Sequence, residues 1–187
     1  MSQDQHMTDV VLTKTAASLL GTVLTIWNGN RAKAADDARA RRRCAADELW
    51  VAIDHLQGTI QKADSWTDPV LLAAAIDRVY AAFRSSEGVR PHGFRHLKRS
   101  VRDSVGEAIG GAAWIDYRDI CEHEPVMYDR MWAQYAAEYL SLMCDRVGTW
   151  RALYSESKAA KVTLPDYNTW LLDTDRWSPT YALSARR

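Results

Sequence analysis

The spacing of apolar residues constrains this chain of 187 residues more than any other feature. Apolar side chains recur every three or four residues along most of its length, and no run alternates with the period of two that a half-buried strand shows. Each such segment forms a helix whose apolar stripe must be buried against other helices. The sequence therefore predicts an all-α fold, a helical bundle of four to five helices with a separate N-terminal hydrophobic helix and one long aromatic-rich helix.

Proline, glycine and asparagine mark the expected boundaries. A break at Asn28-Gly29-Asn30 separates an N-terminal hydrophobic helix, residues 1–30, from a bundle domain, residues 31–173, and a tail follows at residues 174–187. Pro69 and Pro125 each suit the first position of a helix. Within the bundle domain the pattern predicts helices at residues 31–63, 69–84, 94–113, 125–157 and 167–172.

Residues 10–27 are the most hydrophobic stretch, and three interpretations apply to them. A secretory signal is disfavoured, because Asp4 and Asp9 stand where a signal peptide carries positive charge. A spanning helix needs about 20 apolar residues, and Lys14 interrupts this shorter stretch, although the basic residues after Trp27 would hold the remainder in the cytoplasm. The third interpretation is an amphipathic helix packed on protein. The sequence leaves a membrane anchor and an assembly element open.

Two stripes run along this predicted helix. The apolar stripe consists of Leu12, Ala16, Leu19, Val23 and Ile26. The second stripe is small and carries hydroxyl groups, on Thr15, Ser18, Thr22 and Thr25. Because small hydroxyl residues permit close helix approach in water and in lipid, we predict that this face contacts another helix.

Aromatic residues are the unusual part of the composition, with eight Trp and eight Tyr beside two Phe. Trp132, Tyr135 and Tyr139 follow one another at near-heptad spacing in the predicted helix at residues 125–157. A helix of about 30 residues extends ~45 Å, more than a compact bundle of this size requires. We predict that these aromatic residues form an interaction surface for a protein partner or for a second copy.

Charge and cysteine content narrow the class of protein. The 24 basic and 24 acidic side chains cancel, so the whole chain has no net attraction to nucleic acid or to an anionic membrane. Three cysteines without paired spacing are typical of a reducing compartment, which favours the cytoplasm or the cytoplasmic face of a membrane. Cys121 and His123 have no second ligand pair, so we expect no metal site and no cofactor.

One short motif indicates catalysis. Arg118 and His123 are five residues apart, and Asp119 directly follows the arginine. These six residues resemble the R-x4-H signature of the HEPN superfamily, all-α proteins of which many are RNases in toxin and antiviral systems. The resemblance implies that Arg118 stabilises phosphate charge and that His123 acts as general acid or base. A surface turn with an arginine–carboxylate pair is the alternative.

A basic segment offers a further alternative. Arg95, Arg99 and Arg102 share a face of the predicted helix and could bind an anion or a nucleic-acid backbone, although Asp103 and Glu107 follow directly. Taken together, the sequence favours a non-enzymatic helical interaction or assembly protein, membrane-associated or oligomeric through its N-terminal helix. The HEPN-like RNase and the basic-patch nucleic-acid binder are the alternatives.

Overall fold

The computed structural model describes residues 3–64, 69–108 and 129–176; the side chains of residues 3–26, Asn28 and Pro69 lie outside this description. The described residues form six helices and no strand, which confirms the all-α prediction. The chain divides into two compact units, Met1–Ala40 and Arg41–Arg187. We call them the N-terminal unit and the bundle unit. The sequence had placed this boundary at residue 30.

Helix α1 runs without interruption over Gln3–Lys62, so the break predicted at Asn28-Gly29-Asn30 is wrong. Gly and Asn lower helix stability by up to about 1 kcal/mol each relative to Ala, but they do not forbid the helical conformation. The Ala-rich segment that follows favours helix strongly enough to carry the backbone through them. The prediction of separate helices on the two sides of residue 30 therefore underestimated the cooperativity of helix growth.

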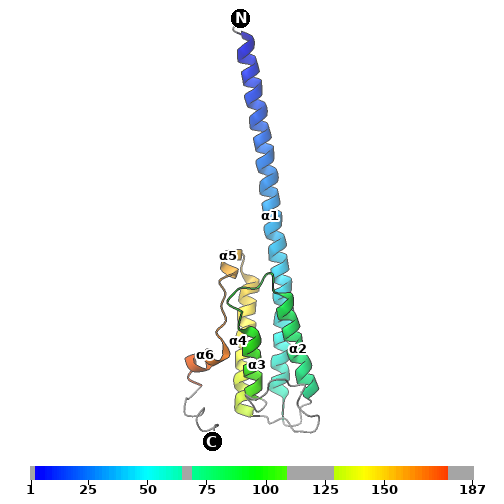
Figure 1. The fold of residues 1–187 in the computed structure, drawn as a ribbon, viewed down its shortest axis with the longest axis vertical. Coiled ribbons are helices and arrows are strands. Elements are labelled where there is room, and N and C mark those ends of the chain that lie inside the picture. Colours follow the sequence, from blue (N-terminus) through cyan, green and yellow to red (C-terminus); the bar gives the residue numbers. More distant parts are fainter. Residues whose placement is uncertain (1–2, 65–68, 109–128, 177–187) are drawn as a thin grey trace. The chain divides into compact units, whose positions relative to one another are not determined.

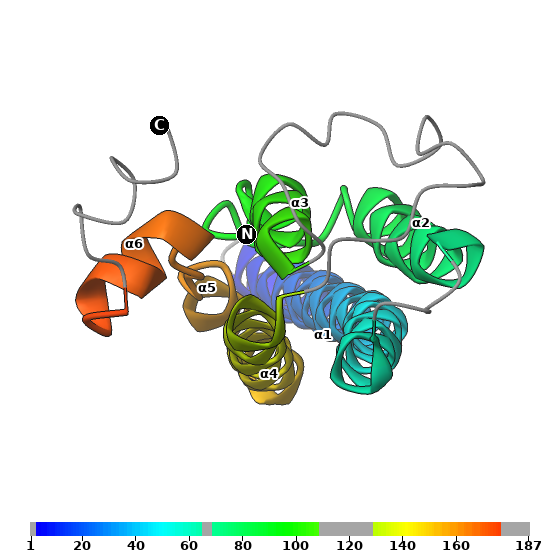
Figure 2. The same cartoon turned by 90° about the horizontal axis from the view of Figure 1, so that it is seen from below.

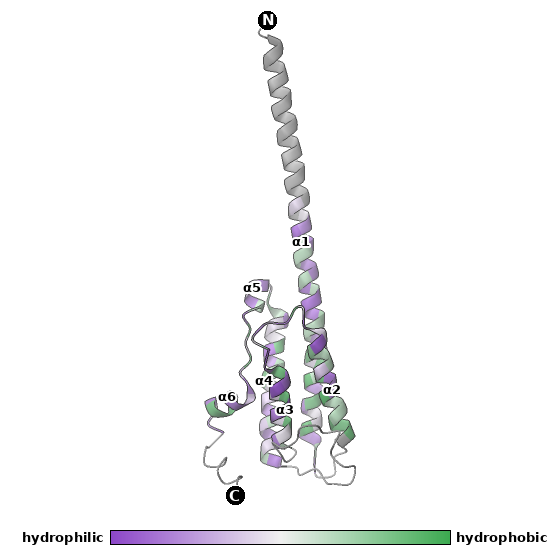
Figure 3. Ribbon diagram, in the orientation of Figure 1, coloured by the Kyte–Doolittle hydropathy of each residue, from purple (hydrophilic) through white to green (hydrophobic). Residues whose placement is uncertain are grey.

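Four helices of the bundle unit surround one core. Residues 41–62 of α1 lie beside α2 (Pro69–Ser85), α3 (Leu97–Ala108) and α4 (Arg130–Ala152), as Figures 1 and 2 show. Neighbouring helices run antiparallel: Ser85 Oγ donates to Glu48 at 3.1 Å, and Gln57 Nε2 donates to the Ala137 carbonyl at 3.1 Å. Hydrophobic and hydrophilic residues alternate around these helices, as bundle packing requires (Figure 3).

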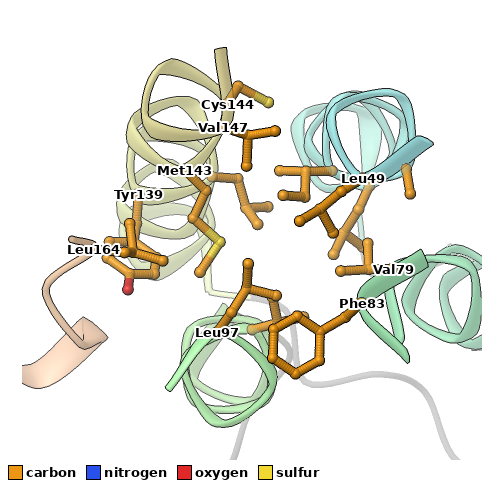
Figure 4. Close-up of a cluster of buried hydrophobic side chains, with 14 of the residues drawn as sticks. Leu49, Val79, Phe83, Leu97, Tyr139, Met143, Cys144, Val147 and Leu164 are labelled. Carbon is orange, nitrogen blue, oxygen red and sulfur yellow. The ribbon is translucent and has the colours of Figure 1, made fainter. Parts of the chain in front are cut away.

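The core consists of the apolar stripes of these four helices. In α1 it holds Leu49, Ile53, Leu56 and Ile60, each with no exposed surface. From the facing helices come side chains that Figure 4 shows pointing to the same centre, among them Val79, Phe83, Leu97, Met143 and Val147. The Phe94 and Trp150 rings meet edge to face with centroids 5.7 Å apart. Full burial of each such side chain contributes about 1.5–3 kcal/mol, so this layer holds the four helices together.

Helix α4 is shorter than predicted at its C-terminal end. The Asp129 side chain caps its first turn by accepting from the N–H groups of Met131 and Trp132, at 2.9 and 3.0 Å. At the other end Leu153 takes an extended conformation, with ψ 130°, and the Ser155 hydroxyl caps a separate turn, α5 (Glu156–Ala159). The predicted continuous helix at residues 125–157 is therefore wrong beyond Ala152, and residues 125–128 lie outside the described part.

The C-terminal segment returns along α3 and α4. Its extended part passes the loop before α3, where Gly93 and Thr163 form a parallel bridge and the Leu164 N–H donates to the Gly93 carbonyl at 3.2 Å. It then forms α6 (Tyr167–Asp173), whose first turn is capped by the Asp166 carboxylate. The sequence predicted this short helix, and the structure confirms it.

Replacing Gly93 with Ala tests the approach of these two backbones. An added Cβ would lie 2.7 Å from Thr163 Cα and would also collide with the Val162 carbonyl oxygen. Because both neighbours are backbone, Gly93→Ala should lower the free energy of unfolding by about 1–3 kcal/mol. Gly148→Ala is the control: it adds a methyl group inside α4 with nothing within 4 Å, and should stabilise the protein by about 0.5–1 kcal/mol. Urea unfolding of both variants measures the difference, and equal midpoints would contradict it.

Alkaline pH tests the burial of Cys144, which is a free thiol like the exposed Cys44. Burial, with the charges of Asp54 and Asp145, raises the pKa of Cys144 from 9.0 to about 12. Between these two values the folded chain holds a proton that the unfolded chain has lost, so stability falls as pH rises. Cys144→Ala should reduce the loss in urea midpoint between about pH 8 and about pH 11; an unchanged loss would show that this thiol does not titrate differently on unfolding.

Candidate interaction surfaces

The N-terminal unit exposes most of its described side chains, with Ala38 and Arg39 partly buried. The side chains of residues 29–37 are all exposed, and Trp27 retains 52% of its surface. The Arg31 guanidinium lies 4.4 Å from the centroid of the Trp27 ring, and Arg39 pairs with Asp36 at 2.9 Å. These contacts join residues one turn apart along the same helix, so they stabilise the helix locally without burying an apolar face.

The predicted hydroxyl stripe lies on this helix. The backbone at Thr15, Ser18, Thr22 and Thr25 is helical, while their side chains lie outside the described residues. Within the part of the chain that the structure describes, no helix combines the length and apolarity that crossing a membrane demands. The anchor and assembly interpretations of residues 10–27 both stay predictions.

The aromatic face of α4 binds the chain's own C-terminal segment. Tyr139 is fully buried; its hydroxyl donates to the Pro165 carbonyl at 2.5 Å, and its ring lies 5.1 Å from Tyr167 and 5.3 Å from Trp170, between centroids. Burial raises the pKa values of both tyrosines, Tyr139 and Tyr167. Of the three residues predicted for interaction, Tyr139 is thus occupied within its own chain.

Trp132 and Tyr135 lie at the edge of this cluster. Their rings meet edge to face at 5.7 Å, and both side chains are half-buried. Arg176 stacks 5.5 Å from the Tyr135 centroid and 4.7 Å from that of Trp170, and its guanidinium pairs with Glu138. The aromatic spacing that suggested an external partner therefore serves in large part to hold α6 against α4.

A groove between α1 and α4 was not predicted. It has a volume of about 360 Å³ and is lined by Gln57, Ile60, Gln61, Arg130, Ala133, Gln134, Ala137, Glu138 and Ser141. Ile60, Ala133 and Ala137 are buried and line it with apolar surface, whereas the amides of Gln57 and Gln134 donate to neighbours on or within α4. The sequence alone could not predict this groove, because its prediction requires knowing which face of α1 pairs with α4.

Among the described residues of the bundle unit, Arg42 is the charged side chain that is buried, with 1% of it exposed. One terminal nitrogen donates to Glu156 Oε1 at 2.7 Å and the other to the Leu153 carbonyl. A run of three arginines such as residues 41–43 is usually a solvated helix face, but Arg42 is buried. Helical spacing could have predicted the burial of Arg42, because it stands four residues before Ala46 and seven before Leu49, both on the buried stripe.

Glu156→Gln tests this contact between α1 and α5. The substitution leaves the buried Arg42 guanidinium without a countercharge, so we expect the free energy of unfolding to fall by about 1–2 kcal/mol, limited by the partial exposure of Glu156. The exposed neighbour provides a control, because Arg43→Met should change stability by less than about 0.5 kcal/mol. Equal stability of the two variants in urea would show that the pair contributes nothing.

The structure places the carboxylate of Asp103 beside two residues of the predicted anion patch. Arg95 precedes α3, where its Nε donates to His96 Nε2 at 2.7 Å and its Nη1 lies 2.7 Å from His92 Nε2. On α3, Arg99 and Arg102 both pair with Asp103, at 3.4 and 2.9 Å. That carboxylate offsets part of the positive charge, and binding of nucleic acid by Arg95, Arg99 and Arg102 stays a prediction.

The catalytic hypothesis rests on residues outside the described part. Arg118 and His123 fall in the stretch at 109–128, as does Cys121, so their HEPN-like roles stay a prediction. Among the described residues, no group of three or more His, Cys, Asp or Glu side chains could hold a metal ion.

Comparison with known proteins finds no matching family model, no matching curated protein and no matching solved structure.

Proposed function

We propose that this chain is a helical assembly protein and that residues 3–40 of α1 are the element through which copies associate. The single helix of the N-terminal unit carries the proposal: α1 runs on through Asn28, Gly29 and Asn30, and the described side chains around them are exposed. Helices that contain weak helix formers gain most of their stability from packing an apolar stripe. A second helix supplies such packing.

The stripe is present in the sequence of the same helix. Positions 12, 16, 19, 23 and 26 are apolar and share one face of α1, and Lys14 lies on the opposite face. The described residues of the N-terminal unit form a single helix, which has no second helix in that unit to cover its stripe. Association with the same stripe of another copy buries both, because an identical surface is self-complementary about a two-fold axis.

Two leucines on different faces separate assembly from insertion into lipid. Leu19 is on the stripe, whereas Leu24 is about a third of a turn away from it. If the stripe packs on a second helix, Leu19→Glu should convert the oligomer to single chains in light scattering, because it places a charge in the interface. Leu24→Glu should leave the mass close to that of the unmodified protein.

Flotation with lipid vesicles completes the experiment. Lipid surrounds every face of a spanning helix, so an anchor should lose vesicle binding equally in Leu19→Glu and Leu24→Glu. That result would assign the helix to the membrane. A single-chain mass for the unmodified protein at all concentrations would contradict assembly through this helix.

A further inference from the structure

We infer that the partner of this helix is a second copy in parallel orientation and the same register, with Asn30 of one chain opposite Asn30 of the other. The inference rests on the proposed function and adds the number of chains in the assembly and the relative direction of their helices. Asn30 belongs to the same helix as the stripe because α1 is continuous through residues 28–30. A helix that ended at Asn28 would leave Asn30 outside the repeat.

The spacing of the stripe defines the register. Steps of four and three residues alternate from Leu12 to Ile26, the spacing of the two core positions of a coiled coil, a and d. Leu12, Leu19 and Ile26 then occupy d positions, and Ala16 and Val23 occupy a positions. The next step of four residues reaches Asn30, at an a position.

Asparagine at a has a specific consequence. In a two-stranded parallel coil, the two a side chains of one layer face each other, so their amides can hydrogen-bond across the interface. Other registers and antiparallel pairing place the amide against an apolar side chain, which leaves a buried polar group unpaired. A single asparagine at an a position therefore selects one register and a two-helix coil, although it lowers the stability of the coil.

The remaining positions of the repeat agree with this register. The outermost position, f, is occupied by Lys14, Gly21 and Asn28, none of which suits an apolar interface. Trp27 flanks the seam at e, where its half-exposed indole can cover the Ile26 layer. The following core positions are Lys33 and Asp37, so the seam ends at Asn30. The seam from Leu12 to Asn30 is about 28 Å long, which predicts association that depends on concentration.

Asn30→Val and Asn28→Val test the role of the amide, because the same substitution is made at a core position and at an outer position of one helix. Asn30→Val should dissociate at lower concentration than the unmodified dimer and should add trimers or tetramers to its mass distribution, since nothing then selects two strands. Asn28→Val should keep the unmodified mass distribution. If both variants associate alike, Asn30 does not face its counterpart and the inference is wrong.

Cross-linking tests orientation in the full chain with Cys44→Ser and Cys121→Ser. In a parallel pair, Ile26→Cys places two thiols in one layer, within the Cα separation of about 4.4–6.8 Å that a disulfide needs, and diamide should join the chains rapidly. Leu24→Cys, off the seam, should react slowly. An unmodified protein that is dimeric, with no faster cross-link at position 26 than at position 24, overturns the parallel register while leaving assembly intact. A single-chain mass at all concentrations overturns both.

Discussion

Burial of the apolar stripe of α1 is the constraint on which the bundle unit depends. Leu49, Ile53, Leu56 and Ile60 leave no surface exposed, and three other helices are needed to cover them. Each covering helix has a stripe of its own that must meet the same centre, as the labelled side chains in Figure 4 do.

Specific polar contacts decide where the helices end around that core. Asp129 begins α4, and Ser155 begins α5 after the extended Leu153. Arg42 then joins α1 to this corner through Glu156 and the Leu153 carbonyl. A buried guanidinium is costly without such partners, so the position of α5 follows from the charge that it neutralises.

The two units use their apolar residues differently. In the bundle unit Tyr139 of α4 is covered by α6, so part of a surface that the spacing suggested for a partner is used within the chain. In the N-terminal unit one helix carries a stripe that no second helix of the unit covers in the described residues. The assembly through α1 that we propose accounts for this contrast, since a second copy would supply what the unit itself lacks.

The sequence by itself determined the helical class, the start of α2 at Pro69, the short helix α6 and the buried faces of the bundle, because helix periodicity and capping depend on near neighbours. It did not determine that Asn28-Gly29-Asn30 stays helical, since cooperativity over a 60-residue helix outweighs local propensity. The burial of Arg42, the groove between α1 and α4 and the cover over Tyr139 needed the tertiary structure. Each brings together residues from distant segments, and the pairing of helix faces that creates them is a property of the whole bundle.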